Sequence, residues 1–254
     1  MSPSATIMLR PGLFAIGLIV AMAGCRGADS PDVVRRDPLE GSPSSGAPTA
    51  DARLRVVFMG TSLTAGHGLD DPADGFTSLI QVMVDSLALP FEIVNAGVSG
   101  ETSAGGVRRV TWLFELPTDV LVLELGANDG LRGQAPSVIK ANLQTIIDRV
   151  RERYPAVKLV IAGMEAPPNM GSQYVGEFRA VFSDLAAAND AQLIPFLLDG
   201  VAGTAALNQR DGIHPNSEGH RRVAATVWKI IEPLLLELAD GLEAVDSGTN
   251  GGQS

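Results

Sequence analysis

Three side chains in this chain of 254 residues are suited to nucleophilic catalysis. His214, one of only three histidines, follows Asp211 by three positions in the segment Asp-Gly-Ile-His-Pro. A carboxylate at that spacing can hold the imidazole, and a neutral imidazole held in this way is a general base. A serine hydroxyl needs such a base before it can attack, and Ser62 in Gly-Thr-Ser-Leu-Thr is the candidate. We therefore predict Ser62, His214 and Asp211 as the catalytic residues of acyl transfer.

Acyl transfer also needs hydrogen-bond donors for the negative oxygen of the tetrahedral intermediate. Gly97, in Asn-Ala-Gly-Val-Ser-Gly, can bring its backbone N–H close because it has no side chain. Asn128, in Gly-Ala-Asn-Asp, can offer its side-chain amide, and Ser62 its own N–H. Losing one such donor costs on the order of 10²–10³ in rate. Ser62, Gly97 and Asn128 are the predicted oxyanion hole.

Alternating strands and helices position these residues. Strands followed in turn by helices favour an α/β fold, with a parallel sheet covered on both faces. The first three strands end just before Ser62, Gly97 and Asn128, at the edge where such sheets bind ligands. The expected strands are 54–59, 91–94, 120–125, 157–162 and 192–196, and the expected helices are 76–89, 103–116, 136–154, 175–189 and 218–239.

Each of these residues alone can be an ordinary cap or turn residue. Together, the four segments resemble in order and spacing the blocks of the SGNH (GDSL-type) hydrolases, over about residues 54–238. The nearest likeness is to the bacterial thioesterase/lysophospholipase/arylesterase branch. The resemblance implies a flavodoxin-like three-layer α/β/α fold with a five-stranded parallel sheet. It also implies hydrolysis of esters or thioesters without metal or other cofactor, through Ser62, Gly97, Asn128, His214 and Asp211.

Five other residues carry weaker expectations. Thr61 stands where the family usually has aspartate, so one hydroxyl must replace the hydrogen bonds of that carboxylate. Glu124, in an apolar strand, must find a partner if it is buried, and we expect Asp129 to hold loop geometry. We expect His67 to be a surface loop residue, with a place in the acyl pocket as the alternative. His220 lacks the i, i+4 spacing of a helical metal pair and is expected to face solvent.

The N-terminal segment predicts export. Arg10, an apolar stretch over 13–22 and small residues at 23 and 24 read as a signal peptide over 1–24; the stretch is shorter than the roughly 20 residues of a membrane span. Residues 22–25 resemble the bacterial lipoprotein box, which implies cleavage before Cys25 and lipidation of its thiol. The alternatives are an ordinary secreted protein and an uncleaved anchor. We expect a membrane-anchored lipoprotein facing the periplasm or cell surface, with a flexible tether over 25–52, a hydrolase domain over 53–240 and a disordered tail over 241–254.

Composition limits the partners. Nineteen basic against 29 acidic residues give a net charge of −10, and without a basic stripe we expect no nucleic acid. The single cysteine, Cys25, excludes an intramolecular disulfide.

The expected substrates are small-molecule or lipid esters: aryl and short-to-medium acyl esters, thioesters or lysophospholipids, with residues 164–171 as an apolar pocket wall. One alternative is a carbohydrate O-acetyl esterase, which would want an aromatic-rimmed cleft, whereas aromatics are 5% here. The other is an inactive lipid-anchored binding protein, which would be expected to have lost a motif.

Overall fold

The computed structural model of the protein describes residues 53–249. The signal peptide, the lipidation site at Cys25 and the tether, all predicted from the sequence, lie outside the described residues, as do residues 250–254. Within the described part, no helix has both the length and the apolar character that a membrane span requires.

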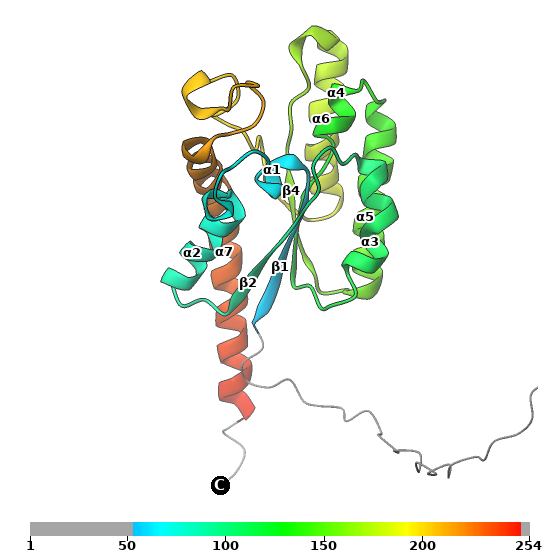
Figure 1. Cartoon of the computed structure of the whole chain (residues 1–254). Helices are drawn as coiled ribbons and strands as arrows, with labels where there is room; N and C mark the ends of the chain where they lie inside the picture. Colours follow the sequence, from blue (N-terminus) through cyan, green and yellow to red (C-terminus); the bar gives the residue numbers. More distant parts are fainter. Residues whose placement is uncertain (1–52, 250–254) are drawn as a thin grey trace, which may run out of the picture. The chain divides into compact units, whose positions relative to one another are not determined.

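A single sheet of five parallel strands forms the middle layer of the fold (Figure 1). The central strands are continuous apolar runs, as in sheets covered on both faces, and every residue of β3 is buried. The sheet confirms the predicted fold class. In spatial order the strands are β2 (Phe91–Gly97), β1 (Leu54–Gly60), β3 (Val120–Glu124), β4 (Lys158–Ala162) and β5 (Gln192–Ile194).

Helices cover the two faces of the sheet. On one side lie α2 (Phe76–Ser86) and α7 (Ser217–Thr249), and on the other α3 (Ser103–Leu113), α5 (Pro136–Arg153) and α6 (Ser172–Ala188) (Figure 1). In α5 the buried residues Ile139, Leu143, Ile146, Ile147 and Val150 follow the helical period, so one apolar stripe faces the sheet. Two short helices, α1 (Ser62–Ala65) and α4 (Ala127–Leu131), begin directly beyond the carboxyl ends of β1 and β3.

The last helix is longer than the sequence pattern predicts. We expected it to end near residue 239 and the chain to be disordered from 241, but α7 continues to Thr249. Leu242 continues the helical spacing of Leu235 and Leu238 beyond the predicted end. Gly241 lies within this stretch, and a helical glycine costs only about 1 kcal/mol relative to alanine. A single glycine is therefore a weak stop signal.

The strand order creates a crevice at one edge of the sheet. From β1 the chain moves outward to β2, and then crosses back over β1 to form β3 on its other side. The connections that leave β1 and β3 therefore diverge. In open parallel sheets ligands bind beyond the carboxyl ends of the strands at such a point. Ser62 follows β1 and Asn128 follows β3, so the fold places both at this crevice.

Candidate active site

Ser62 lies at a tight turn between β1 and α1. The chain is packed so closely here that a Cβ added to Gly60 would lie 2.1 Å from Thr64 Oγ1 and 2.5 Å from Glu124 Oε2. Thr61 caps α1, its hydroxyl accepting a 3.4 Å hydrogen bond from the Leu63 N–H. Ser62 is therefore the first helical residue, and it lines a pocket at the carboxyl edge of the sheet.

His214 and Asp211 meet Ser62 from the loop that precedes α7. His214 Nε2 is 2.9 Å from Ser62 Oγ, and its Nδ1 is 2.6 Å from Asp211 Oδ2. The other carboxylate oxygen of Asp211 accepts the backbone N–H groups of Ile213 (2.9 Å) and His214 (3.0 Å). Gly212, with φ of +70°, allows the tight turn between them. The three residues thus form a continuous hydrogen-bonded chain across 152 positions of sequence.

The charge on Asp211 determines which nitrogen of His214 carries the proton. The hydrogen bond from the His214 side chain, together with the N–H groups of Ile213 and His214, holds the pKa of Asp211 far below its usual range. An ionised carboxylate can only accept hydrogen bonds, so His214 Nδ1 must donate. Nε2 then presents its lone pair to the Ser62 hydroxyl, which is the tautomer a general base requires.

Of the three predicted oxyanion donors, Asn128 and Ser62 line the pocket, whereas Gly97 does not. Asn128 lines the pocket, and one of its two side-chain N–H groups donates to Glu101 O at 3.0 Å. The Ser62 N–H has no acceptor in the described part of the chain. The Gly97 N–H, in contrast, donates to Asn95 Oδ1 at 3.0 Å, and Gly97 does not line the pocket.

Gly97 instead provides a close contact beneath α1. A Cβ there would lie 2.3 Å from Ala65 N, so only glycine lets β2 approach this helix. Gly100, in the same sequence motif, has φ of +78° and an N–H without an acceptor among residues 53–249. It directly precedes Glu101, whose carbonyl contacts Asn128. The sequence shows two glycines in this loop, but it does not show which of their N–H groups already donates a hydrogen bond within the protein.

Two acidic residues near the site have structural partners, as the sequence analysis expected. Asp129 is buried and accepts hydrogen bonds from the N–H (2.8 Å) and hydroxyl (2.7 Å) of Ser103, which ties α4 to α3. Glu124 is also buried and accepts hydrogen bonds from Thr61 and Thr64. Neither carboxylate lines the pocket.

The other two histidines occupy different surroundings. His67 is exposed, as predicted, but its ring centroid lies 4.8 Å from that of His214, and it does not line the pocket. The prediction that His220 faces solvent is wrong, because His220 is only 1% exposed. Its Nδ1 accepts the Phe76 N–H at 3.2 Å, its ring stacks on that of Phe76, and burial lowers its pKa to about 4. Neutral His220 thus caps the start of α2.

The pocket beside Ser62 is large and mostly apolar. Its volume is about 700 Å³, within the range of small-molecule sites. One wall is the segment 164–168, which is the first part of the expected wall over 164–171. The others come from α4, residues 196–203 and the loop of His214. Glu165 and Arg179, which form an exposed 2.7 Å ion pair, are the charged residues of the lining. Such a pocket fits an apolar group attached to the reacting carbonyl.

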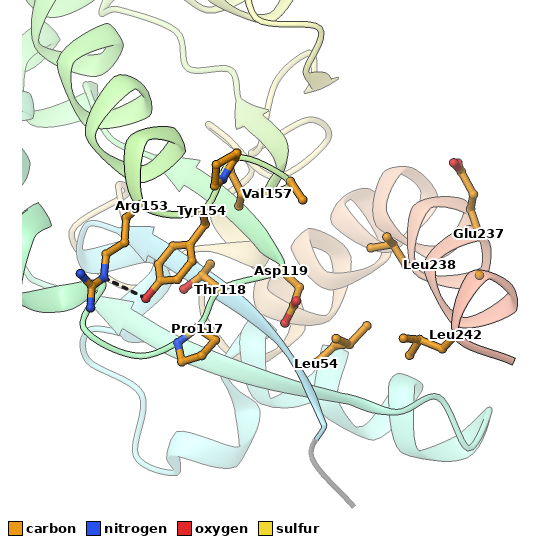
Figure 2. A pocket seen from close by; sticks show the side chains of 13 residues that line it. Leu54, Pro117, Thr118, Asp119, Arg153, Tyr154, Val157, Glu237, Leu238 and Leu242 are labelled. Carbon is orange, nitrogen blue, oxygen red and sulfur yellow. Dashed lines mark hydrogen bonds between the residues drawn. The ribbon is translucent and has the colours of Figure 1, made fainter. Parts of the chain in front are cut away.

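A second cavity lies at the opposite edge of the sheet. It has a volume of about 520 Å³, and Leu54, Val157, Leu238 and Leu242 line it together with Asp119 (Figure 2). Leu54 begins β1, while Asp119 and Val157 directly precede β3 and β4. This cavity is therefore at the amino ends of the parallel strands, at the edge opposite Ser62 and Asn128. Among residues 53–249 no cluster of three or more metal-ligating side chains is found at either edge.

The chain belongs to the GDSL-like lipase/acylhydrolase family, whose model matches residues 58–222, and it is therefore a carboxylic ester hydrolase. It is 37% identical over 185 residues to Esterase TesA of Pseudomonas aeruginosa, covering 72% of this chain and 90% of that protein. It is 32% identical to thioesterase 1/protease 1/lysophospholipase L1 of Escherichia coli K12, covering 73% and 87%. A crystal structure of TesA matches with a TM-score of 0.67 and 36% identity, covering 71% of this chain and 99% of that one.

Proposed function

We propose that this protein hydrolyses carboxylic esters by a serine mechanism, with Ser62 as nucleophile, His214 as general base and Asp211 as the carboxylate that orients it. The observation that carries the proposal is the unbroken chain of hydrogen bonds, 2.9 Å from His214 Nε2 to Ser62 Oγ and 2.6 Å from His214 Nδ1 to Asp211 Oδ2. These distances are short enough for proton transfer without rearrangement.

The reaction proceeds in two halves through an acyl-enzyme. Ser62 Oγ attacks the ester carbonyl while His214 Nε2 takes its proton, and His214 then returns that proton to the leaving alcohol or thiol. A water molecule next attacks the acyl-Ser62 carbonyl, again giving its proton to His214. Collapse of the second intermediate releases the carboxylic acid and restores the Ser62 hydroxyl. Asp211 stabilises the imidazolium formed in each half without taking its proton.

Negative charge on the carbonyl oxygen is stabilised by N–H donors that are not used elsewhere. The Ser62 N–H and the second side-chain N–H of Asn128 are two such groups. For the third donor the observations favour Gly100 over Gly97, because the Gly97 N–H is taken by Asn95. Donors already held in place act without the cost of reorienting during the reaction.

The apolar lining favours esters and thioesters with hydrophobic acyl or aryl groups, including lysophospholipids. Such substrates also agree with the names of the relatives in Pseudomonas aeruginosa and Escherichia coli. Phe196 is the only phenylalanine, tyrosine or tryptophan in the lining, which disfavours a carbohydrate esterase with a sugar-stacking rim. The assembled triad disfavours an inactive binding protein.

The N-terminal sequence supports export and anchoring through a lipid on Cys25, which would place the enzyme at a membrane surface facing the periplasm or cell exterior. Metabolic labelling with an alkyne fatty acid tests this part separately. Label should enter the full chain in cells and be absent from the Cys25→Ser variant. Equal labelling of both proteins would contradict the anchor and leave the esterase proposal intact.

Kinetics of site variants test the catalytic proposal. Ser62→Ala and His214→Ala should each lower kcat for an aryl ester by roughly 10⁴ or more, and Asn128→Ala by about 10²–10³. Circular dichroism should show all three folded. A folded Ser62→Ala variant with kcat near that of the wild type would contradict the mechanism.

A series of esters of increasing acyl length tests whether the acyl group of the substrate binds in the pocket beside Ser62. Ala202 is exposed and lines the pocket, so Ala202→Trp should obstruct long chains and leave room for acetate. The kcat/KM for octanoyl esters should fall by about tenfold or more while that for acetyl esters changes little. Equal effects on both esters would place the acyl chain elsewhere.

A further inference from the structure

Glu124 is a buried carboxylate directly beneath the nucleophile turn. Glu124 is the last residue of β3 and is only 1% exposed to solvent. It lies opposite Gly60 in the pairing of β1 with β3. Ser62 is two residues beyond Gly60. Glu124 neither lines the pocket nor contacts Ser62, His214 or Asp211, so the acyl-transfer steps above give it no role.

Donors on both sides of Ser62 converge on this carboxylate. Glu124 Oε2 accepts the Thr61 N–H at 2.8 Å, the Thr64 hydroxyl at 2.7 Å and the Thr64 N–H at 3.3 Å. The Thr61 hydroxyl donates to Oε1 at 2.9 Å. The residues immediately before and two positions after Ser62 are thereby attached to one rigid point at the end of a central strand.

The two oxygens of a carboxylate accept all four hydrogen bonds. Two of the donors are backbone N–H groups, which cannot accept, and each threonine hydroxyl carries one hydrogen. A glutamine in the same place has one acceptor oxygen in place of two, so its NH₂ would face the Thr61 hydroxyl and reverse that hydrogen bond. Four donated bonds partly offset the burial of charge, although burial still raises the pKa of Glu124 to about 7.

Among residues 53–249, no charged side chain forms a salt bridge with Glu124. Arg109, which contacts the end of β1, is paired with Glu101, and its guanidinium donates to Ala96 O (2.8 Å) and Gly60 O (3.5 Å) rather than to Glu124. An unpaired carboxylate inside a protein is destabilising relative to an apolar residue that fills the same space. Its presence is accounted for if these hydrogen bonds serve the reaction.

Thr61 matches this arrangement. Its hydroxyl points at Glu124, where an aspartate side chain would place a second carboxylate. Two carboxylates in contact cannot both be ionised without repulsion. The threonine hydroxyl supplies a donor in place of that charge, so Thr61 and Glu124 form a complementary pair in this chain.

Resting on the proposed function, we propose that Glu124 is a positioning residue that, through Thr61 and Thr64, holds the turn on which Ser62 Oγ faces His214 Nε2. A displacement of a reacting group by about 1 Å can cost on the order of 10² in rate. The role therefore predicts an effect on the chemical step and little effect on substrate binding.

Steady-state kinetics and the rate of fluorophosphonate labelling, measured on the full chain, test this role. Glu124→Gln should lower kcat and the labelling rate by about 10- to 100-fold, with KM changed less than about threefold. Thr61→Val should lower both rates by about fivefold to tenfold, and Thr61→Ser, which keeps the hydroxyl, should recover most of the loss.

Thr118→Val is the matched control, because Thr118 is a buried threonine at the opposite edge of the sheet. It should change the melting temperature without lowering kcat. The proposal is overturned if folded Glu124→Gln keeps kcat within about twofold of the wild type. If Glu124→Gln does not fold, the Thr61 variants test the proposal instead. Equal kcat values for Thr61→Val, Thr61→Ser and Thr118→Val would then overturn it. Ser62→Ala separates the positioning role of Glu124 from the serine mechanism on which it rests. Activity in that variant would refute the serine mechanism itself.

Discussion

At the scale of single residues, the two carboxylate oxygens of Asp211 accept hydrogen bonds from different donors. One oxygen accepts the His214 ring N–H and the other accepts the backbone N–H groups of Ile213 and His214. The carboxylate thus fixes both the tautomer of the imidazole and the loop that carries it. This combination explains why a spacing of three residues, with a glycine between, is compatible with the role.

Asp211→Asn keeps the size of the side chain and removes its charge. Asparagine can point an N–H at His214 Nδ1, which favours the tautomer in which Nε2 carries the hydrogen and cannot act as a base. We expect kcat to fall by about 10³–10⁴ with a small change in KM, measured with an aryl ester. Retention of more than a tenth of kcat would show that Asp211 does not set the tautomer.

Gly97→Ala tests the assignment of Gly97 to packing. The new Cβ would lie 2.3 Å from Ala65 N and 2.8 Å from the Thr64 carbonyl carbon, so β2 and α1 must separate. We expect a loss of about 1–3 kcal/mol in the free energy of unfolding, measured by chemical denaturation, and a lower kcat. An unchanged free energy of unfolding would contradict the close contact.

The three residues of the proposed triad were easy to single out, because few types of side chain can act as nucleophile, base or orienting carboxylate. Ser62, His214 and Asp211 follow from the chemistry and from their order along the chain. The distinction between Gly97 and Gly100 was not predictable, since it depends on the Asn95 side chain accepting one particular N–H. The burial of His220 was missed because helical spacing alone does not show that Phe76, 144 positions away, packs against it.

At the scale of elements, α2 and α7 are joined by His220. Its Nδ1 accepts the first backbone N–H of α2, from Phe76, in place of a side-chain cap on Gly75. An acceptor of this kind must be neutral, and burial keeps it so by lowering its pKa to about 4. We therefore expect the contact between these two helices to weaken when His220 is protonated.

The sign of this dependence follows from proton binding in the two states. Between pH 6.5 and 4 the unfolded chain binds a proton at His220 and the native protein does not, so stability falls as pH falls through this window. His220→Gln keeps an acceptor for Phe76 but cannot titrate. Its loss of stability between pH 7 and 4, measured by urea denaturation, should be smaller than that of the wild type. Equal losses would contradict a neutral buried His220.

Helix α6 offers a test of the element boundaries. Gly176 lies inside this helix, and a Cβ there would meet nothing within 4 Å. Gly176→Ala should raise the free energy of unfolding by roughly 0.5–1 kcal/mol, because alanine loses less backbone freedom on folding. A destabilised variant would mean that this segment is not helical or not open as described.

The sequence predicted the type and order of all five strands and of the five long helices. The short helices α1 and α4 were not predicted, because four or five residues give no periodicity. The end of α7 was also misplaced, since its Gly/Ser-rich composition resembles that of a tail.

At the scale of the whole molecule, the strand order β2-β1-β3-β4-β5 makes the site possible. It places the loops after β1 and β3 on either side of one crevice, and the loop before α7 completes it with His214. The location of the site at this edge followed from the sequence pattern. One apolar wall was also expected, but the volume of the pocket was not predictable, because it depends on the conformations of segments 164–168 and 196–203.

Identification of the residue that a fluorophosphonate modifies is the most direct test of the account. The reagent bonds covalently to an activated serine, so intact and peptide mass spectrometry should find one adduct per chain, on Ser62, formed together with loss of esterase activity. Ser62→Ala should take up no label, and His214→Ala should take it up far more slowly. A folded wild-type protein that hydrolyses esters without acquiring an adduct on Ser62 would contradict the central claim.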